Sequence, residues 1–450
     1  MAKKEQAVHG LKSRHIELLA LGGTIGTGLF LGSGRAIHVA GPAILLAYLI
    51  TGVFCWGIMR ALGELLLSNL KYHSFMEAIR DYLGERVSFI IGWAYWACWV
   101  ALAMAEITAI GLYFKLWLPQ VPQWLPGLLT LIVLLCLNLM SVSKFGEFEF
   151  WFSMIKVLAI VVLIVIGVGM VIFRFHSTDS VVATPVNLVK FNGFFATGWH
   201  GFLLSFQMVV FAYVGIEMVG VTAAEAENPK LVIPRVINRI PLLLTILYVG
   251  ALVVVMCIYP WNRLLAGNSP FVLVFRDIGL TAAAGIVNFI VLTAAASACN
   301  SSLYTTGRML AELTASAQHN SIRQLSRLSN RRVPSRAVIV SALVVAVASI
   351  LNFVMPAGVF TFISSIATTS FLFVWMAIIE THLKYLKAQP RRRQFKMPGA
   401  PLTDYLIFLF LFGILGVLCL DHQTLIALIL TIIWFIILAI FSRRQHKQVN

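Results

Sequence analysis

Four ionisable side chains lie inside long apolar stretches of this 450-residue chain: Glu64, Glu106, Lys156 and Glu217. If those stretches cross a lipid bilayer, each charge costs about 2.5–3.5 kcal/mol even on the mildest insertion scale. Each residue is therefore a candidate functional group. A buried carboxylate can accept hydrogen bonds from loosened backbone or attract a cation, and a buried ammonium can donate hydrogen bonds or exchange a proton.

Lys156 carries the most specific chemistry, because an apolar run from Val157 to Ile160 follows it and Ser153 lies one turn before it. Burial disfavours the charged ammonium, so a lysine in this position can release and regain a proton. The alternative is a permanently charged lysine that cross-links two helices. For Glu64 and Glu106, structural roles such as a pair with a nearby arginine or a bond to freed backbone explain the sequence equally well.

Two of the apolar stretches contain residues that interrupt a helix. The first holds Thr24 and Thr27 among six glycines: Gly22, Gly23, Gly26, Gly28, Gly32 and Gly34. The sixth contains Phe211-Ala-Tyr-Val-Gly-Ile-Glu217, which places a glycine and a carboxylate in mid-membrane. The glycines also fit a small-residue packing motif, GxxxG, twice. Because each glycine costs about 1 kcal/mol in a helix, six of them favour an unwound segment at Thr24-Ile25-Gly26-Thr27-Gly28.

The composition identifies the setting of these residues. Apolar residues make up 60% of the chain and charged residues 12%, against about 25% charged in soluble domains. So few charges cannot cover the surface of a soluble protein, which excludes soluble enzymes, disordered chains and secreted disulfide-rich domains. The six cysteines occur singly, without a CxxC pair, and no histidine lies in mid-span. Neither a disulfide framework nor a metal or other cofactor is therefore expected.

Twelve apolar stretches are long enough to cross a bilayer as helices of about 20 residues. Their predicted bounds are 16–36, 41–63, 87–114, 124–141, 149–173, 199–224, 238–260, 278–307, 337–355, 357–380, 403–420 and 422–441. Residues 72–83 predict a short amphipathic helix outside the membrane, and the eighth span continues as helix-forming sequence to about residue 318. We therefore predict an all-α polytopic membrane protein.

The net charge of +16 is distributed unevenly along the chain. Counted with the adjacent span ends, one alternate set of loops and both chain ends carry 27 of the 34 Lys and Arg residues; the other set carries six, and Lys156 lies inside a span. Because positively charged loops stay in the cytoplasm, both ends are predicted to be cytoplasmic and the protein to lie in the cell membrane. The basic loops are expected to contact anionic lipid, and no nucleic-acid partner is expected.

The two interrupted stretches lie about 190 residues apart, and each opens a block of five spans. Because five is odd, the second block enters the membrane from the opposite side, which gives an inverted repeat with two spans appended. The predicted divisions are a cytoplasmic amino terminus at 1–15, a first repeat at 16–173, an extracellular loop at 174–198, a second repeat at 199–382, a basic cytoplasmic loop at 383–402, two further helices at 403–441 and a cytoplasmic carboxyl terminus at 442–450. Interrupted helices at matching positions of such repeats are typical of a secondary transporter's binding site.

Other membrane-protein classes fit less well. An enzyme would need a nucleophile with a base, or a metal site, in mid-membrane, and the chain has no HExxH motif. A channel would show repeated pore-lining motifs or charged rings. An ATP-driven pump would need a GxxxxGK[ST] motif, which is absent from the sequence. The sequence makes no prediction of the oligomeric state.

Several motifs resemble those of bacterial amino-acid permeases of the amino acid–polyamine–organocation superfamily, in particular its amino acid transporter family. They are HGLKSRHIELLALGGTIGTGLF at 9–30, EITAIG at 106–111, GEFEFWFSMIK at 146–156, GIEMVGVTAAE at 215–225 with NP at 228–229, and GRML at 307–310. Within the family, the sequence is most similar to permeases for proline and small neutral amino acids, or for serine and threonine, and less similar to those for basic amino acids.

The resemblance implies a LeuT-type fold, a 5+5 inverted repeat with breaks in the first and sixth of twelve helices, and proton-coupled uptake. In the family, the stretch matching Thr24–Gly28 unwinds and holds the substrate carboxylate. Phe211 matches an aromatic gate above the substrate, and Gly215 and Glu217 belong to the second break. Lys156 matches a lysine that takes the place of a sodium ion in proton-coupled members. The secondary polar candidates are Glu106, Glu225 and Asn300.

A zwitterion needs hydrogen-bond donors at one end and acceptors at the other, and an unwound helix offers both from its backbone. Selectivity would then come from apolar walls such as Phe211 and Tyr213. The predicted function is transport and not enzyme catalysis: symport of a free small neutral amino acid with a proton into the cell. Transport of aromatic amino acids or GABA by the same fold, or exchange without proton coupling, is the alternative.

Overall fold

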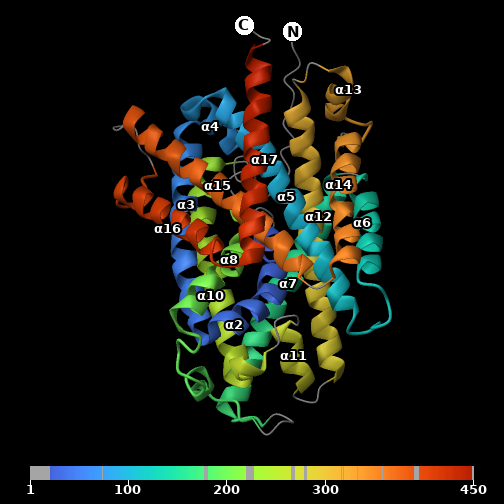
Figure 1. The fold of residues 1–450 in the computed structure, drawn as a ribbon, viewed down its shortest axis with the longest axis vertical. Coiled ribbons are helices and arrows are strands. Elements are labelled where there is room, and N and C mark those ends of the chain that lie inside the picture. The colour runs from blue at the N-terminus through green and yellow to red at the C-terminus, as the bar shows by residue number, and fades with distance from the viewer. Residues whose placement is uncertain are drawn as a thin grey trace.

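The computed structural model describes residues 21–72, 74–140, 142–176, 181–218, 228–264, 269–277, 281–315, 317, 319–331, 333–356, 358–389 and 395–447. This part of the chain is helical, apart from turns, loops and an isolated bridge between His176 and Val182. The helices form one elongated bundle (Figure 1). Within the described residues, eight helical segments are long and apolar enough to cross a membrane, and α6 (Trp124–Asn138) and α16 (Leu402–Leu418) are shorter apolar helices. The all-α fold predicted from composition is confirmed.

The other helices fall on either side of the second predicted break. Those before it are α2 (Ser33–Ala40), α3 (Ile44–Ser68), α4 (Phe75–Leu83), α5 (Glu85–Phe114), α7 (Val142–Ile172) and α8 (Gly198–Tyr213). Those after it are α10 (Pro229–Ile258), α11 (Pro270–Asp277), α12 (Thr281–Ala315), α13 (Asn320–Arg323), α14 (Ser335–Val354), α15 (Val359–Ala388) and α17 (His422–Lys447). A π-helical segment, η1 (Gly28–Gly32), leads into α2, and the turn η2 (Gly41–Ala43) divides the apolar segment Gly28–Ser68 into the first and second spans.

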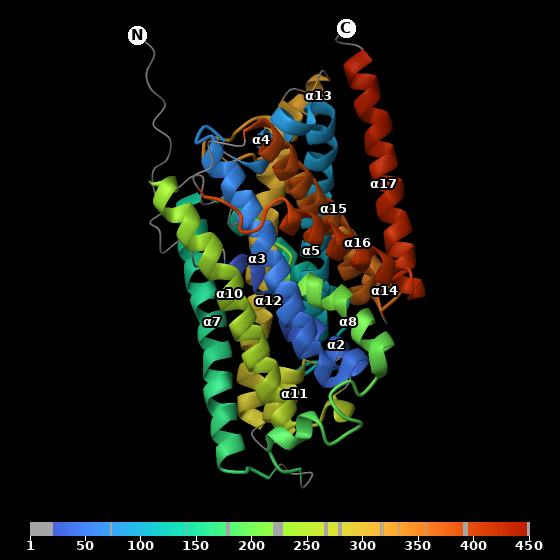
Figure 2. The ribbon, with the colours of Figure 1, turned by 90° about the vertical axis from the view of Figure 1, so that its left-hand side faces the viewer.

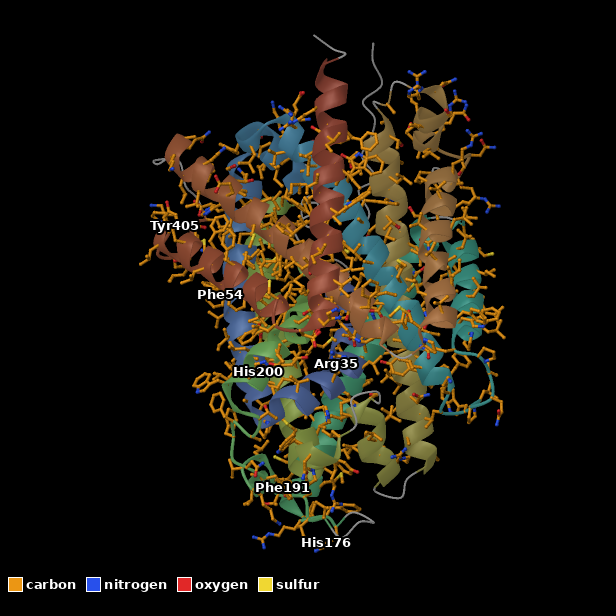
Figure 3. All side chains as sticks on the ribbon, in the orientation of Figure 1. Arg35, Phe54, His176, Phe191, His200 and Tyr405 are labelled. Carbon is orange, nitrogen blue, oxygen red and sulfur yellow. The ribbon has the colours of Figure 1, made fainter. Side chains whose placement is uncertain are left out.

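The bundle has two ends, and each is named after a helix that it carries. The α4 face carries α4 and α13, and the α11 face carries α11 and the segment between α7 and α8 (Figures 1 and 2). Figure 3 places His176 and Phe191 of that segment on the α11 face. The helix α7 ends at the α11 face (Figure 2), so its amino-terminal part is the part nearer the α4 face.

The elements outside the spans follow their sequence patterns in part. In α4, Phe75 and Ile79 are buried whereas Arg80 and Asp81 are exposed, as the amphipathic pattern of 72–83 predicts. The long eighth helix is also confirmed, because the 35 residues of α12 extend about 52 Å at 1.5 Å per residue. The helix α11 was not predicted, since its eight residues lie in what the sequence suggested to be a loop before the eighth span.

A buried cluster of ionisable side chains joins α3, α15 and α16. The two ring nitrogens of His382 lie 3.1 Å from Glu64 Oε2 and 2.9 Å from Asp404 Oδ1. Glu64 also accepts the backbone N–H of Met397 at 2.7 Å. Arg60, the partner of Glu64 that the sequence suggested, donates its own hydrogen bonds to α10 and to the segment before α16. Glu64 therefore has a structural role in attaching α16 to the bundle.

Removal of one member of this cluster is expected to destabilise the fold by about 3–5 kcal/mol, because the remaining charges would stay buried without full compensation. Glu64→Ala tests this through the free energy of unfolding, measured by denaturant titration in detergent. Arg80→Gln is the control, since the Arg80–Asp81 pair, at 3.8 Å, is about half exposed and is expected to contribute less than about 1 kcal/mol. Equal effects of the two substitutions would contradict the structural role of the cluster.

Candidate functional site

The first span is interrupted between Thr24 and Thr27. Residues 21–24 are helical, Ile25 and Gly26 are not, and the helix resumes at Thr27. Glu106 of α5 faces the interruption, and its two carboxylate oxygens accept the Thr27 backbone N–H at 3.1 and 3.3 Å. A Cβ atom at Gly26 would collide with Glu106 Oε1, so glycine allows the carboxylate to approach. The break predicted from the glycines is confirmed, and Glu106 is a part of it.

The second break follows α8 and lies directly beside the first. Residues Val214–Glu217 form a turn in which Gly215 has a φ of +89°, a conformation that glycine adopts without strain and other residues rarely adopt. A Cβ atom at Gly215 would lie only 3.6 Å from the carbonyl oxygen of Gly23. Two interrupted helices that are far apart in the sequence therefore meet at their breaks, as the paired pattern predicts.

The first span crosses α8 at a close backbone contact. A Cβ atom at Gly28 would lie 2.6 Å from the Cα atom of Ala212. Beside this crossing, the hydroxyl of Tyr248 on α10 lies 3.2 Å from the Ala212 carbonyl oxygen and 3.4 Å from that of Thr24. One hydroxyl group thus reaches both interrupted helices and offers a donor to backbone that has left helical geometry. Close packing therefore explains Gly28, in addition to the unwound segment that the glycines predict.

Lys156 of α7 is fully buried, and its ammonium group donates a hydrogen bond to the carbonyl oxygen of Gly22 at 2.6 Å. This carbonyl belongs to the short helical turn before the first break. Ser153 packs against the same glycine, where a Cβ atom would overlap the serine hydroxyl. In the part of the chain that the structure describes, no carboxylate lies within salt-bridge distance of Lys156. The lysine therefore holds the break through backbone and not through a fixed ion pair among these residues.

Glu217 holds the second break from the side of α5 and α15. Its carboxylate is fully buried and accepts hydrogen bonds from the Tyr95 hydroxyl at 3.2 Å and from the Trp375 indole N–H at 3.0 Å. The rings of Trp99 and Phe371 pack edge to face against Tyr95, with centroids 6.0 Å away. An aromatic wall thus surrounds the carboxylate, which anchors the turn to two neighbouring helices.

The two aromatic residues predicted as pocket walls lie differently. Phe211 is buried, and its ring meets Phe360 of α15 edge to face at 6.0 Å. The Tyr213 hydroxyl instead lies 3.1 Å from the carbonyl oxygen of Tyr48 on α3 and 2.9 Å from Thr245 Oγ1 on α10. These contacts turn its polar end toward the interface between α3 and α10, so the structure does not place the two side chains on one wall.

The secondary polar candidates also differ in where they lie. Asn300 accepts a hydrogen bond from the Asn138 side chain at 2.7 Å and so links α12 to α6. This contact has the character of a packing hydrogen bond between helices, which is the role that weak polar candidates most often have. Glu225 lies outside the described residues. Of Glu106 and Asn300, the two secondary candidates that the structure describes, Glu106 contacts a break.

Two buried polar residues near the breaks were missed in the sequence. Glu149 of α7 accepts a hydrogen bond from Ser297 of α12 at 2.6 Å, and it lies seven residues, or two helical turns, before Lys156 on the same helix face. That spacing could have identified it. Tyr248 could not have been found in this way, because it lies within an ordinary apolar run and its hydrogen-bond partners come from the first span and α8.

This arrangement gathers loosened backbone from two helices at one point, held by side chains of α5, α7 and α10. A half-helix begins at Thr27 on one side of the point. Glu106 already accepts the Thr27 N–H, so the other N–H groups at this amino-terminal end are the ones that favour a further carboxylate. Loosened carbonyl groups favour an ammonium. Backbone alone can therefore recognise both ends of a zwitterion. Within the described ranges, no three His, Cys, Asp or Glu side chains gather in a way that could hold a metal ion.

Known transporters resemble this chain over its whole length. A family model described as "Amino acid permease" matches residues 15–448. Amino-acid permease AapA of Bacillus subtilis (strain 168) is 53% identical over 452 residues, which cover 99% of this chain and 97% of that protein. The D-serine/D-alanine/glycine transporter of Escherichia coli (strain K12) is 42% identical, with 98% and 94% covered. The probable threonine/serine transporter YbxG of Bacillus subtilis (strain 168) is 39% identical, with 100% and 98% covered.

Proposed function

Because this chain belongs to the amino acid permease family, we propose that it takes up a small neutral amino acid together with a proton by secondary active transport. Membership makes it a multi-pass membrane transporter and not an enzyme, with the twelve-helix, LeuT-type architecture of the family. The observation that carries the proposal of proton coupling is the hydrogen bond from Lys156 to the Gly22 carbonyl. A protonated lysine secures the first break, and deprotonation removes one of its N–H donors and its charge.

A small substrate is supported by the relatives and by the packing at the breaks. One relative is named for D-serine, D-alanine and glycine, and another for threonine and serine. A Cβ atom at Gly215 would lie 3.6 Å from the Gly23 carbonyl oxygen, and one at Gly28 would lie 2.6 Å from the Cα atom of Ala212. Little room is left between them, which favours an amino acid with a short side chain.

We assign the substrate carboxylate to the backbone of Thr24–Gly28 and its ammonium to carbonyl groups of the turn at Gly215. Phe211 covers the substrate side chain, since this buried ring is the last large side chain of α8 directed toward α15. Glu217 and Glu106 hold the two breaks in place through their hydrogen bonds. No side-chain charge is then required to bind the zwitterion directly.

The α4 face is proposed to be the cytoplasmic face. It carries α4 and α13, which belong to the loop set that, with the chain ends, holds 27 of the 34 Lys and Arg residues. The two five-helix repeats, 16–173 and 199–382, would then alternate between states open to the α4 face and to the α11 face. The exposed cations on the α4 face are expected to contact anionic lipid.

The proposal is tested in proteoliposomes with a panel of labelled amino acids: glycine, proline, threonine, both enantiomers of alanine and serine, phenylalanine and GABA. Counterflow identifies the substrates, and an imposed pH gradient tests whether they accumulate. We expect counterflow of the small neutral members and accumulation toward the alkaline side. Counterflow of phenylalanine or GABA alone would contradict the proposed substrate class. Counterflow without accumulation would identify an exchanger and contradict proton coupling.

Phe211→Ala is expected to weaken selection by side-chain size, because removal of the ring opens the space that it covers. The competition of leucine against alanine should rise by roughly tenfold, which is the range for a few added methylene groups in an apolar pocket. The measurement is inhibition of labelled alanine counterflow. The control is Phe412→Ala on α16, whose ring is 59% exposed. An unchanged profile in the Phe211 variant would place the size-selecting wall on α5 or α15.

A further inference from the structure

Three buried polar side chains form a line on one face of α7: Glu149, Ser153 and Lys156. Their spacing of four and then three residues places successive members one helical turn apart on the same face. We propose that Glu149 and Ser153, together with water, form the path along which Lys156 exchanges its proton with the α4 face. This inference rests on the proposed proton coupling through Lys156 and adds the route that the proton follows.

Glu149 has an oxygen that its surroundings do not use. Its side chain is fully buried, and Oε1 accepts the Ser297 hydroxyl of α12 at 2.6 Å. The second oxygen, Oε2, has no hydrogen-bond partner among the described residues. Buried polar atoms without partners are rare and costly. If Glu149 only linked α7 to α12, the lack of a partner for Oε2 would have no explanation. In proton exchange, Oε2 accepts a hydrogen bond from water or takes up the proton.

Ser153 repeats this property one turn further along the helix. Its hydroxyl is buried and also has no hydrogen-bond partner in the described part of the chain. A helical serine commonly donates to the carbonyl group four residues earlier, as Ser302 of α12 does with Ala298. Ser153 does not make this bond, so its hydroxyl can accept a proton from one side while it donates its own to the other.

The other carboxylate near Lys156 is less suited to this role. Glu149 shares a helix face with Lys156, and Glu106 contacts the same first break that Lys156 contacts. Both oxygens of Glu106 accept the Thr27 N–H across the first break, whereas Glu149 keeps one oxygen without a described partner. Glu149 also lies nearer the start of α7, and therefore on the side of the α4 face. The helix α12 faces this line with the neutral Ser297, whose hydroxyl donates to Glu149.

The proton transfer balances without any oxidant or reductant. Glu149 lies seven positions before Lys156, which is about 10 Å along the helix, so the proton needs an intermediate carrier. An N–H bond of the ammonium breaks, and its proton passes through water and the Ser153 hydroxyl, which gives up one proton as it gains another. The proton arrives on the Glu149 carboxylate, leaving a neutral amine and a carboxylic acid. The acid then releases it to water at the α4 face, which restores the carboxylate.

The test compares Glu149→Gln with Ser297→Ala in proteoliposomes. Glutamine keeps an acceptor for Ser297 but cannot carry the proton, whereas Ser297→Ala removes the helix link and keeps the carboxyl group. Proton entry coupled to substrate is followed with a pH dye inside the vesicles, beside substrate exchange without a gradient. We expect Glu149→Gln to slow coupled proton entry by roughly a hundredfold, the lower range for loss of a positioned proton carrier. Exchange should change much less, and Ser297→Ala should retain coupled entry.

Ser153→Ala is expected to slow coupled proton entry less than Glu149→Gln does, because water can replace its hydroxyl. Its matched control is Ser349→Ala on α14, another buried hydroxyl without a described partner. Normal proton entry in Glu149→Gln would overturn the path while leaving coupling through Lys156 intact. Equal loss in Glu149→Gln and Ser297→Ala would identify a helix link and also overturn it. If the unmodified protein admits no proton with its substrate, the proposed function itself fails.

Discussion

Lys156→Arg is expected to abolish amino-acid accumulation driven by an imposed pH gradient. Arginine keeps the positive charge and can still donate to the Gly22 carbonyl, but it does not release a proton under physiological conditions. Lys156→Ala should lose accumulation as well, because it removes both the charge and the hydrogen bond of 2.6 Å. The measurement is uptake of labelled substrate in proteoliposomes with an acidic exterior, for the unmodified protein beside both variants.

Lys384→Arg is the control for this experiment, because Lys384 is exposed near the end of α15. The protein with this substitution should accumulate substrate normally. Full accumulation by Lys156→Arg would show that Lys156 is a permanently charged link between α7 and the first span. Full accumulation by Lys156→Ala would remove the residue from the mechanism. Counterflow without a gradient shows in each case whether the variant still binds and moves its substrate.

Gly28→Leu is expected to reduce uptake to the background while the protein still inserts into the membrane. A Cβ atom at this position would lie 2.6 Å from the Cα atom of Ala212, and backbone cannot move aside as a flexible side chain can. Overpacking of this kind costs about 1–3 kcal/mol, which displaces the two breaks from each other without unfolding twelve helices. Membrane content is measured by immunoblot, and uptake and substrate binding are measured on the same vesicles.

Gly413→Leu provides the matched control, since nothing lies within 4 Å of a Cβ atom built at this exposed position of α16. It exchanges the same residue types in an apolar helix and should leave uptake unchanged. Ordinary uptake by Gly28→Leu would contradict the close contact of the breaks as a requirement for transport. A variant that fails to reach the membrane would show that the contact is needed for folding before it is needed for transport.

Much of the fold could be predicted from the sequence because a bilayer imposes simple rules. Apolar length defines the spans, and the glycines around Gly26 and at Gly215 indicated both breaks. At Gly215 the φ of +89° is one that few other residues adopt, whereas at Gly26 a Cβ atom would collide with Glu106. The long α12 followed from an unbroken run of helix-forming residues. The short helix α11 was missed because its eight residues are neither long enough to span a membrane nor bounded by a clear periodic pattern.

The residues of the candidate site could be recognised in the sequence more easily than the contacts that they make. Lys156 and Glu217 stand out as charges in apolar sequence, but their partners come from other helices and leave no local signal. The direction of the Tyr213 hydroxyl depends on Thr245, which lies 32 residues away on α10. Glu149 was missed because the predicted span began there, whereas α7 begins at Val142 and includes it in the helix. Helix ends are set by flanking contacts more than by composition.

The close contacts of the glycines have a consequence for how this sequence can evolve. At Gly26 the obstacle to a larger residue is the carboxylate of Glu106, and at Gly22 it is the hydroxyl of Ser153. Either clash can be relieved by a second substitution that shortens the opposing side chain. At Gly28 the obstacle is the backbone of Ala212, which every amino acid shares. No compensating mutation at that position can restore the space, so Gly28 is closed to suppressor mutations at its contact, whereas Gly22 and Gly26 can change together with their partners.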